Sequence, residues 1–215
     1  MIRLYSIPIS SYSAKVRIVL CAKGLAFEDA APPGGYSSTD YARLVPSATM
    51  PAIDHDGLIV WDSEAINEYL EEVCPDPPML PAEPANRAAA RSLSRFHDTR
   101  LEPNIRALFS QVAPGSRDLD AVERGVAQIE QRLNQLSAIL GKVPFPAGER
   151  LMISDCGYAI SFVVLDALRD GIGFCLDIPG EVVAYRDRIF NHEPVAEEIA
   201  LYRKTIGEWA RDRGK

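Results

Sequence analysis

The first third of the chain alternates between short apolar runs and longer amphipathic stretches. Val16, Val19 and Leu20 share one face of a stretch that ends at Gly24, which is typical of an amphipathic helix. The Asp-Gly pair at 56–57 stands between two apolar runs and is typical of a tight β-hairpin. The pattern predicts strands at 2–5, 27–31, 52–54 and 58–61 and helices at 13–23 and 63–73, in the order β-α-β-(short α)-β-β-α.

The pattern changes after this region. Residues 74–84 hold five prolines and cannot continue a helix. Beyond them the apolar positions follow only the helical period, which is typical of helices packed around a core. Three stripes carry this signal: Leu101, Ile105, Leu108, Phe109 and Val112; Val122, Val126, Ile129, Leu133, Leu136 and Leu140; Val195, Ile199, Tyr202, Ile206 and Trp209. We therefore expect an α/β domain at 1–80, a linker at 81–86 and an all-helical domain at 87–215.

Composition and charge exclude several classes of protein. Lys and Arg number 23 against 30 Asp and Glu, so the net charge is −7, which argues against a nucleic-acid or anionic membrane surface. No stretch approaches the roughly 20 apolar residues of a membrane span, and the first ten residues lack signal-peptide features. The four cysteines form no C-x-x-C pair and the three histidines have no ligand-like spacing. We expect a cytoplasmic protein without a metal site.

Met50-Pro51 precedes the predicted hairpin. An X-Pro bond adopts the cis form at a cost of about 0.5–1 kcal/mol, far less than other peptide bonds. A cis bond would present the N–H and C=O of Met50 as a paired donor and acceptor, on which a peptide ligand could dock as an added strand. The alternative is a trans proline that opens a strand, which the motif taken alone favours.

Asp62-Ser63 opens the second predicted helix directly after a strand. Either residue type at a helix start is commonly an N-cap. The free N–H groups and the positive end of the helix dipole also favour a carboxylate at this place. Ser63 would then hold the carboxylate of a ligand's amino-acid end, and Asp62 its ammonium group.

Ser10-Ser11-Tyr12-Ser13 lies between the first predicted strand and helix. A free thiol has a pKa near 8.5, and a hydroxyl that donates to the sulfur at a helix N-terminus stabilises the thiolate. A polar loop with a serine N-cap is the simpler interpretation. Because no His or Asp stands nearby in the sequence to activate a serine, a chemical role here would be thiolate stabilisation rather than acyl transfer.

The order and spacing of the three motifs resemble a cytosolic glutathione transferase, most of all the zeta-like and related bacterial serine-type branches. The resemblance covers nearly the whole chain and implies a thioredoxin-like N-terminal domain, a helical bundle, glutathione as co-substrate and a homodimer. By this resemblance Ser10 stabilises the thiolate of glutathione and Met50, before Pro51, pairs with its cysteinyl unit. Asp62 and Ser63 bind its γ-glutamyl end.

The chain departs from that family at two places. Zeta members carry Ser-Ser-Cys at the first turn, where Tyr12 replaces the cysteine, and an alignment with β-aryl-ether-cleaving relatives points to Ser13 instead of Ser10. Ser11 remains a third candidate. Without a cysteine, thiol-transferase chemistry is disfavoured, because a mixed disulfide needs a protein thiol. By the resemblance, Asp155 matches an aspartate at the start of the helix that runs through the core of the second domain, where its role is in folding. Met152 stands where the family has a Ser or Thr cap for that helix.

The resemblance places the pocket for the electrophile between the two domains. Ile9 and Tyr12 are candidates from the first domain. His97, Arg100 and Asn104 share one face of a predicted helix in the second domain, for which a solvated helix face is the alternative.

The expected function is therefore that of a glutathione transferase, an enzyme that adds the glutathione thiolate to an electrophilic small molecule. One alternative is a glutathione-dependent isomerase of the maleylacetoacetate or maleylpyruvate type, or an ether-cleaving or dehalogenating enzyme. The other is a non-enzymatic, protein-binding member of the same fold. The same bound thiolate begins all of the reactions, so the sequence does not distinguish among them.

Overall fold

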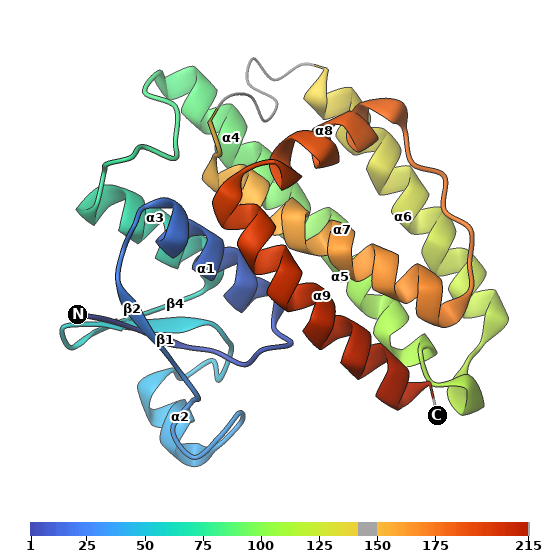
Figure 1. Ribbon diagram of the computed structural model, residues 1–215, viewed down its shortest axis with the longest axis horizontal. Coiled ribbons are helices and arrows are strands. Elements are labelled where there is room, and N and C mark those ends of the chain that lie inside the picture. Colours follow the sequence, from blue (N-terminus) through green and yellow to red (C-terminus); the bar gives the residue numbers. More distant parts are fainter. Residues whose placement is uncertain (142–149, 215) are drawn as a thin grey trace. The chain divides into compact units, whose positions relative to one another are not determined.

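A computed structural model describes residues 1–141 and 150–214, and the chain divides into two compact units, Met1–Met79 and Leu80–Lys215 (Figure 1). The first unit contains the predicted order of strands and helices. Its elements are β1 Ile2–Tyr5, α1 Ser11–Ala22, β2 Phe27–Ala30, α2 Thr39–Leu44, β3 Ala52–His55, β4 Leu58–Trp61 and α3 Ser63–Val73. The thioredoxin-like α/β domain expected from the sequence is confirmed.

The four strands of this unit form one sheet in the order β2-β1-β3-β4. β1 runs parallel to β2 and antiparallel to β3, and β3 pairs antiparallel with β4. The hairpin between β3 and β4 turns through Asp56 (φ 52°) and Gly57 (φ 93°), where a positive φ at both positions matches the twist of the strands. The side chain of Asp54 accepts from the Gly57 N–H at 2.8 Å and closes this turn.

Helices α1 and α3 lie side by side and run in the same direction. Lys15 and Glu64 pair at 2.6 Å near the start of both helices, and Lys23 and Glu71 pair at 2.6 Å near their ends. Both lysines are buried, so each carboxylate compensates a charge that has lost its water. Two buried ion pairs at opposite ends thereby fix the register between the helices.

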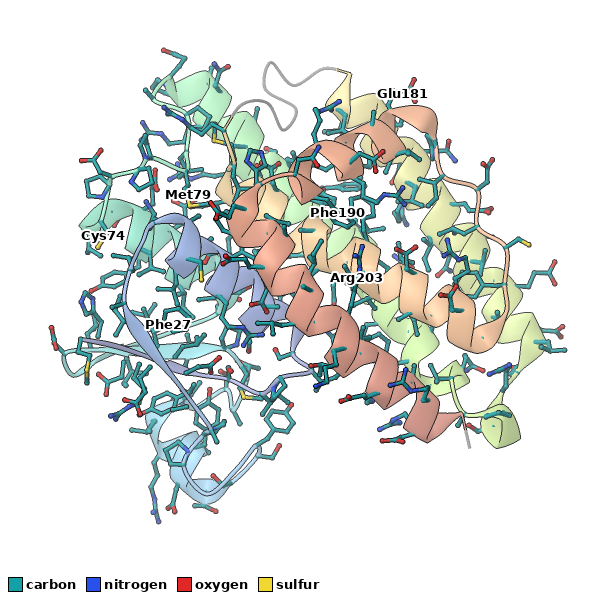
Figure 2. All side chains as sticks on the ribbon, viewed as in Figure 1. Phe27, Cys74, Met79, Glu181, Phe190 and Arg203 are labelled. Carbon is teal, nitrogen blue, oxygen red and sulfur yellow. The ribbon has the colours of Figure 1, made fainter. Side chains whose placement is uncertain are left out.

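The proline-rich segment after α3 is fixed to the first unit. The Lys23 ammonium group donates to the carbonyls of Cys74 and Pro77 at 2.8 and 3.0 Å, and the N–H of Met79 donates to Glu71. Cys74 and Met79 of this segment are labelled in Figure 2. The expected linker at 81–86 is only partly correct, because helix α4 begins at Pro84. A proline suits the first turn of a helix, where its missing N–H would have no partner.

All secondary-structure elements of the second unit are helical in the part of the chain that the structure describes. Its elements are α4 Pro84–Phe96, the π-helical turn η1 His97–Leu101, α5 Glu102–Ala107, the 3₁₀ turns η2 Leu108–Gln111 and η3 Pro114–Ser116, α6 Leu119–Leu140, α7 Ile153–Ile172, α8 Gly180–Phe190 and α9 Glu193–Arg213. Helix α7 is the centre of the unit and is buried over most of its length, with α9 packed along it. The expected helical second domain is confirmed.

The start of α7 depends on the buried carboxyl of Asp155. It accepts from the N–H of Met152 at 2.9 Å and from the hydroxyl of Tyr185 at 2.7 Å. In a capping box with Ser or Thr at the N-cap, the aspartate three residues later accepts from the N–H of the N-cap residue. Asp155 makes this bond with the N–H of Met152, so this half of the box is kept and Met152 is tolerated. Burial, which outweighs these hydrogen bonds, raises the pKa of Asp155 from 3.8 to about 6.

Candidate functional site

The register of the sheet brings the three sequence motifs to one end of the first unit. Tyr5 at the end of β1 pairs with Ala52 at the start of β3, and Ala52 pairs with Trp61 at the end of β4. The serine turn follows β1, Met50-Pro51 precedes β3 and Asp62-Ser63 follows β4. All three motifs therefore extend from the same end of the sheet, where the strand ends at Tyr5, Ala52 and Trp61 lie side by side. Helices α1 and α3, which run parallel, begin at this end.

Ser10 is the N-cap of α1. Its hydroxyl oxygen accepts from the N–H of Ser13 at 3.2 Å, which leaves the hydroxyl proton available to donate to another group. The side chain is partly exposed. Its position at the positive end of the helix dipole favours an anion such as a thiolate.

The other two serines of the turn are buried. Ser11 is the first residue of α1, and Ser13 has no exposed surface. The Ser13 hydroxyl oxygen also lacks a hydrogen-bond partner among the described residues. Because a ligand at the surface does not reach a fully buried hydroxyl, the geometry favours Ser10 over Ser13 as the group that contacts a thiol.

Met50-Pro51 is a cis peptide bond. The residues before it are held by Tyr41 of α2, whose hydroxyl donates to the carbonyl of Thr49 at 2.8 Å. Burial raises the pKa of Tyr41 to about 12, so the hydroxyl keeps its proton and remains a donor. Met50 itself packs against a small core that includes Tyr5, Tyr41 and Ala52. Tyr41 is not among the site residues predicted from the sequence, because an aromatic residue on a short helix was its only signal.

Asp62 has an unusual backbone conformation, with φ 74° and ψ 125°. A non-glycine residue in this region is strained by about 1–3 kcal/mol. One oxygen of its carboxylate, Oδ1, accepts from the N–H groups of Glu64 and Ala65 at 2.9 and 3.2 Å and caps α3. The carboxylate is exposed, and its second oxygen has no protein partner among the described residues. The adjacent Ser63 is buried in the first turn of the helix.

The residues expected to line an electrophile pocket belong to different environments. Ile9 and Tyr12 are half-buried in and beside the first turn of α1. His97 is buried within the second unit, where its ring contacts Asp98 at 2.7 Å and Ser161 at 2.8 Å. The expectation of a ligand-facing or solvated position is therefore wrong for His97. It is a core residue whose two ring nitrogens both have protein partners.

The shared face expected for residues 97, 100 and 104 requires an uninterrupted α-helix. The π-helical turn at His97–Leu101 inserts an additional residue into the helical repeat, so these positions do not share one face as they would in a regular helix. Arg100 is exposed and lines a cavity with residues of α6. The side-chain amide of Asn104 donates to the carbonyl of Arg100.

Over residues 1–141 and 150–214, no three His, Cys, Asp or Glu side chains are grouped so as to hold a metal ion. No helix in these ranges is long and apolar enough to cross a membrane.

Known proteins resemble this chain in sequence and in fold. The family described as glutathione S-transferase, N-terminal domain, matches residues 4–78. A stringent starvation protein A homolog of Coxiella burnetii is 31% identical over 153 residues, which cover 71% of this chain and 70% of the relative. The maleylacetoacetate isomerase of Rattus norvegicus is 38% identical over 105 residues, which cover 46% of this chain and 49% of the isomerase.

A solved structure extends the likeness over the whole fold. The delta-class glutathione transferase of Nilaparvata lugens superposes with a TM-score of 0.83 at 21% identity, covering 99% of this chain and 100% of that one. The thioredoxin-like unit, the helical unit and the sequence matches agree. The chain therefore belongs to the glutathione S-transferase family.

Proposed function

We propose that the first unit binds glutathione at the end of the sheet where the three motifs meet. The observation that supports this is the strand register, which aligns Tyr5, Ala52 and Trp61 and so gathers the segments attached to them. The backbone of Met50 pairs with the cysteinyl unit of glutathione. Asp62 takes the γ-glutamyl ammonium group through its second carboxylate oxygen, and the N–H groups at the start of α3, with Ser63, take the γ-glutamyl carboxylate.

Ser10 would then stabilise the thiolate of the bound peptide. The thiol proton leaves to water, and the Ser10 hydroxyl donates to the sulfur anion beside the first turn of α1. If an electrophile is present, the sulfur lone pair forms the new S–C bond. In a substitution the leaving group departs with its bonding electron pair, and in an addition to a conjugated carbonyl the C=C π pair shifts towards the carbonyl oxygen. This is the step expected of a transferase or an isomerase of the family.

A binding function without turnover is the second candidate, and the comparisons favour it. The relative from Coxiella burnetii, matched over 71% of this chain, has a name that states no reaction, whereas the isomerase is matched over only 46%. We therefore propose that this is a cytoplasmic, glutathione-binding protein whose main role is to bind a protein partner.

A second copy of the chain is the partner for which the first unit offers a surface. β4 is an edge strand of the sheet, so its outer backbone groups have no strand partner among residues 1–141 and 150–214. Leu58 and Trp61 on this strand are 51% and 44% exposed, and Val73 at the end of α3 is 45% exposed. An edge strand flanked by exposed apolar side chains supports the expectation of a homodimer.

Two assays with the purified full-length chain separate the candidates. Calorimetric titration measures glutathione binding, and conjugation to an activated aryl halide or isomerisation of a cis dienone measures turnover. Binding without turnover is the result we expect, whereas turnover that Ser10→Ala abolishes would establish the enzymatic function instead. A chain that neither binds glutathione nor turns over a substrate would refute the proposed site.

A further inference from the structure

The helical unit contains a cavity between α7 and α9, the two helices that pack along each other. It has a volume of about 610 Å³, which is in the range of small-molecule sites. Its wall includes small residues of both helices, Ala167 and Gly171 on α7 and Gly207 and Ala210 on α9. Because these side chains are short, they leave open the space that larger side chains would fill.

Groups of opposite charge line the two sides of this cavity. Asp166 and Asp170 belong to α7, whereas Arg203 and Arg211 belong to α9. Over residues 1–141 and 150–214, no carboxylate lies within 4.0 Å of the guanidinium group of either arginine. The charges of the two helices therefore face one cavity without forming an ion pair across it.

Each aspartate of the cavity keeps one oxygen without a protein partner. Arg169, on the same helix, contacts Oδ1 of Asp166 and Oδ1 of Asp170, both at 3.3 Å. The Oδ2 atoms of the two carboxylates have no hydrogen-bond or ion-pair partner in the part of the chain that the structure describes. The two aspartates are four residues apart, so they lie on one face of α7. This arrangement suits an ammonium group, which carries three donors.

The two arginines supply donors for a carboxylate. The guanidinium group of Arg203 lies over the ring of Phe190, 5.6 Å from its centroid, and this stacking orients it (Figure 2). A Cβ at Gly207 would lie 3.8 Å from Nη1 of Arg211, so the second guanidinium group lies beside the wall of the cavity. Neither group has a hydrogen-bond acceptor among the described residues. Both are therefore available to carboxylate oxygens.

Apolar side chains complete the wall of the cavity. Val163 of α7 and Ile206 of α9 supply this surface. An ion without a hydrocarbon part would leave these side chains without a contact. A ligand with an apolar body, an ammonium group at one end and a carboxylate at the other would use all three kinds of surface.

We propose that this cavity binds a short apolar peptide by its two free ends. The N-terminal ammonium group contacts Asp166 and Asp170, and the C-terminal carboxylate contacts Arg203 and Arg211. The inference uses no residue assigned to the proposed glutathione site and does not require that glutathione binds.

The first test uses four peptides and calorimetry on the full-length protein. We expect leucyl-phenylalanine to bind, and its N-acetyl and C-terminal amide forms to bind at least about tenfold more weakly, because each lacks one charge. Glycylglycine, which keeps both charges without the apolar body, should also bind more weakly. Equal binding of either blocked peptide would overturn the recognition of that end, and equal binding of glycylglycine would overturn the apolar part.

Substitutions assign each end of the peptide to one helix. Arg203→Gln should raise the Kd of leucyl-phenylalanine about tenfold and leave the Kd of its amide unchanged, since the amide has no carboxylate to lose. Asp170→Asn should likewise weaken binding of the free peptide but not of its N-acetyl form. Lys204→Gln and Glu208→Gln are the matched controls, because both residues are exposed on α9 and do not line the cavity. Equal losses in the controls would refute the assignment.

A third variant blocks the cavity without changing its charge. Gly207→Leu adds a side chain to the wall, and leucine favours a helix more than glycine does, so the variant should keep its fold. Thermal denaturation checks the fold, and the Kd of leucyl-phenylalanine should rise at least about tenfold. Unchanged affinity in a folded Gly207→Leu would overturn the proposal. A tenfold loss in Asp62→Asn of the first unit would assign the peptide to the glutathione motifs instead, which also overturns it.

Discussion

At the residue scale, the helix cap that Ser10 forms does not compete with the donor role proposed for its hydroxyl. Its oxygen accepts from the N–H of Ser13 and caps α1, while its proton stays available for a ligand sulfur. The sequence left Ser10, Ser11 and Ser13 as alternatives because all three have the same hydroxyl. Burial, which depends on how the turn packs, separates them: Ser10 is partly exposed, whereas Ser11 keeps only 9% of its surface and Ser13 none.

Ser10→Ala should raise the pKa of the bound glutathione thiol towards its free value of about 8.5, because the donor to the thiolate is lost. The Kd of glutathione should change by less than about threefold, since its other contacts remain. Thiolate absorbance followed across pH measures the shift. Ser10→Thr is the control, because it keeps the hydroxyl and should keep the lowered pKa. An unchanged thiol pKa in Ser10→Ala would assign the role to another group.

Asp155 makes the stability of the helical unit depend on pH. Its pKa is raised by burial from 3.8 to about 6, so the native state binds this proton more tightly than the unfolded state does. Its stabilising contribution is therefore complete below about pH 4 and is lost as the pH rises through about 6, a change of roughly 3 kcal/mol.

Asp155→Asn should remove this dependence, because the amide does not titrate and can still accept from the Met152 N–H. The variant should be less stable than the wild type at pH 4, and the difference should narrow by pH 7. Chemical denaturation at several pH values measures both free energies of unfolding. If the free energy of unfolding of the wild type exceeds that of the variant by the same amount from pH 4 to pH 7, the raised pKa of Asp155 is contradicted.

At the element scale, the segment from α4 to α5 shows where periodicity alone fails. The apolar positions Leu101, Ile105 and Leu108 predicted one helix, and all three are buried. The backbone instead passes through a π-helical turn before α5 and a 3₁₀ turn after it. The pattern identifies which side chains face the core, but not the additional residue that the π-turn inserts, because that depends on the packing of His97.

Other elements were predicted accurately from the sequence where their hydrophobic pattern and end signals are clear. Strand β4 and helix α3 begin and end at the predicted residues, since a hairpin signal and an N-cap mark them. Helix α7 carries no clear apolar stripe because it is buried on most sides, and only the family resemblance indicated it. The positions of the site motifs could likewise be predicted, whereas their convergence required the strand register.

The close approach of α7 to the π-turn requires Gly157. A Cβ at this position would lie 2.6 Å from Cε1 of His97. Gly157→Ala should therefore destabilise the protein by about 1–3 kcal/mol, despite the higher helix propensity of alanine. Gly171→Ala in the same helix is the control, since its Cβ would lie 3.8 Å from Ala210 and should leave stability equal or increased. Thermal denaturation measures both, and equal effects would contradict this packing.

At the scale of the whole molecule, the exposed edge of the sheet predicts self-association. Leu58→Asp should convert a dimer into a monomer, because it places a charge on the apolar edge strand β4. Light scattering at several protein concentrations measures the mass. Leu119→Asp is the control, because Leu119 is also exposed, at 73%, but belongs to the helical unit. A wild-type monomer at all concentrations would contradict the proposed dimer.

The central claim is that, in this family member, the end of the sheet where the three sequence motifs meet forms a glutathione site. Calorimetric titration of glutathione into the wild type and Asp62→Asn tests it most directly, because asparagine preserves the helix cap and tolerates the positive φ but lacks the charge that holds the ammonium group. The account predicts binding by the wild type and about tenfold weaker binding by the variant at equal stability. Equal affinity in both proteins, or no binding at about millimolar glutathione, would contradict it.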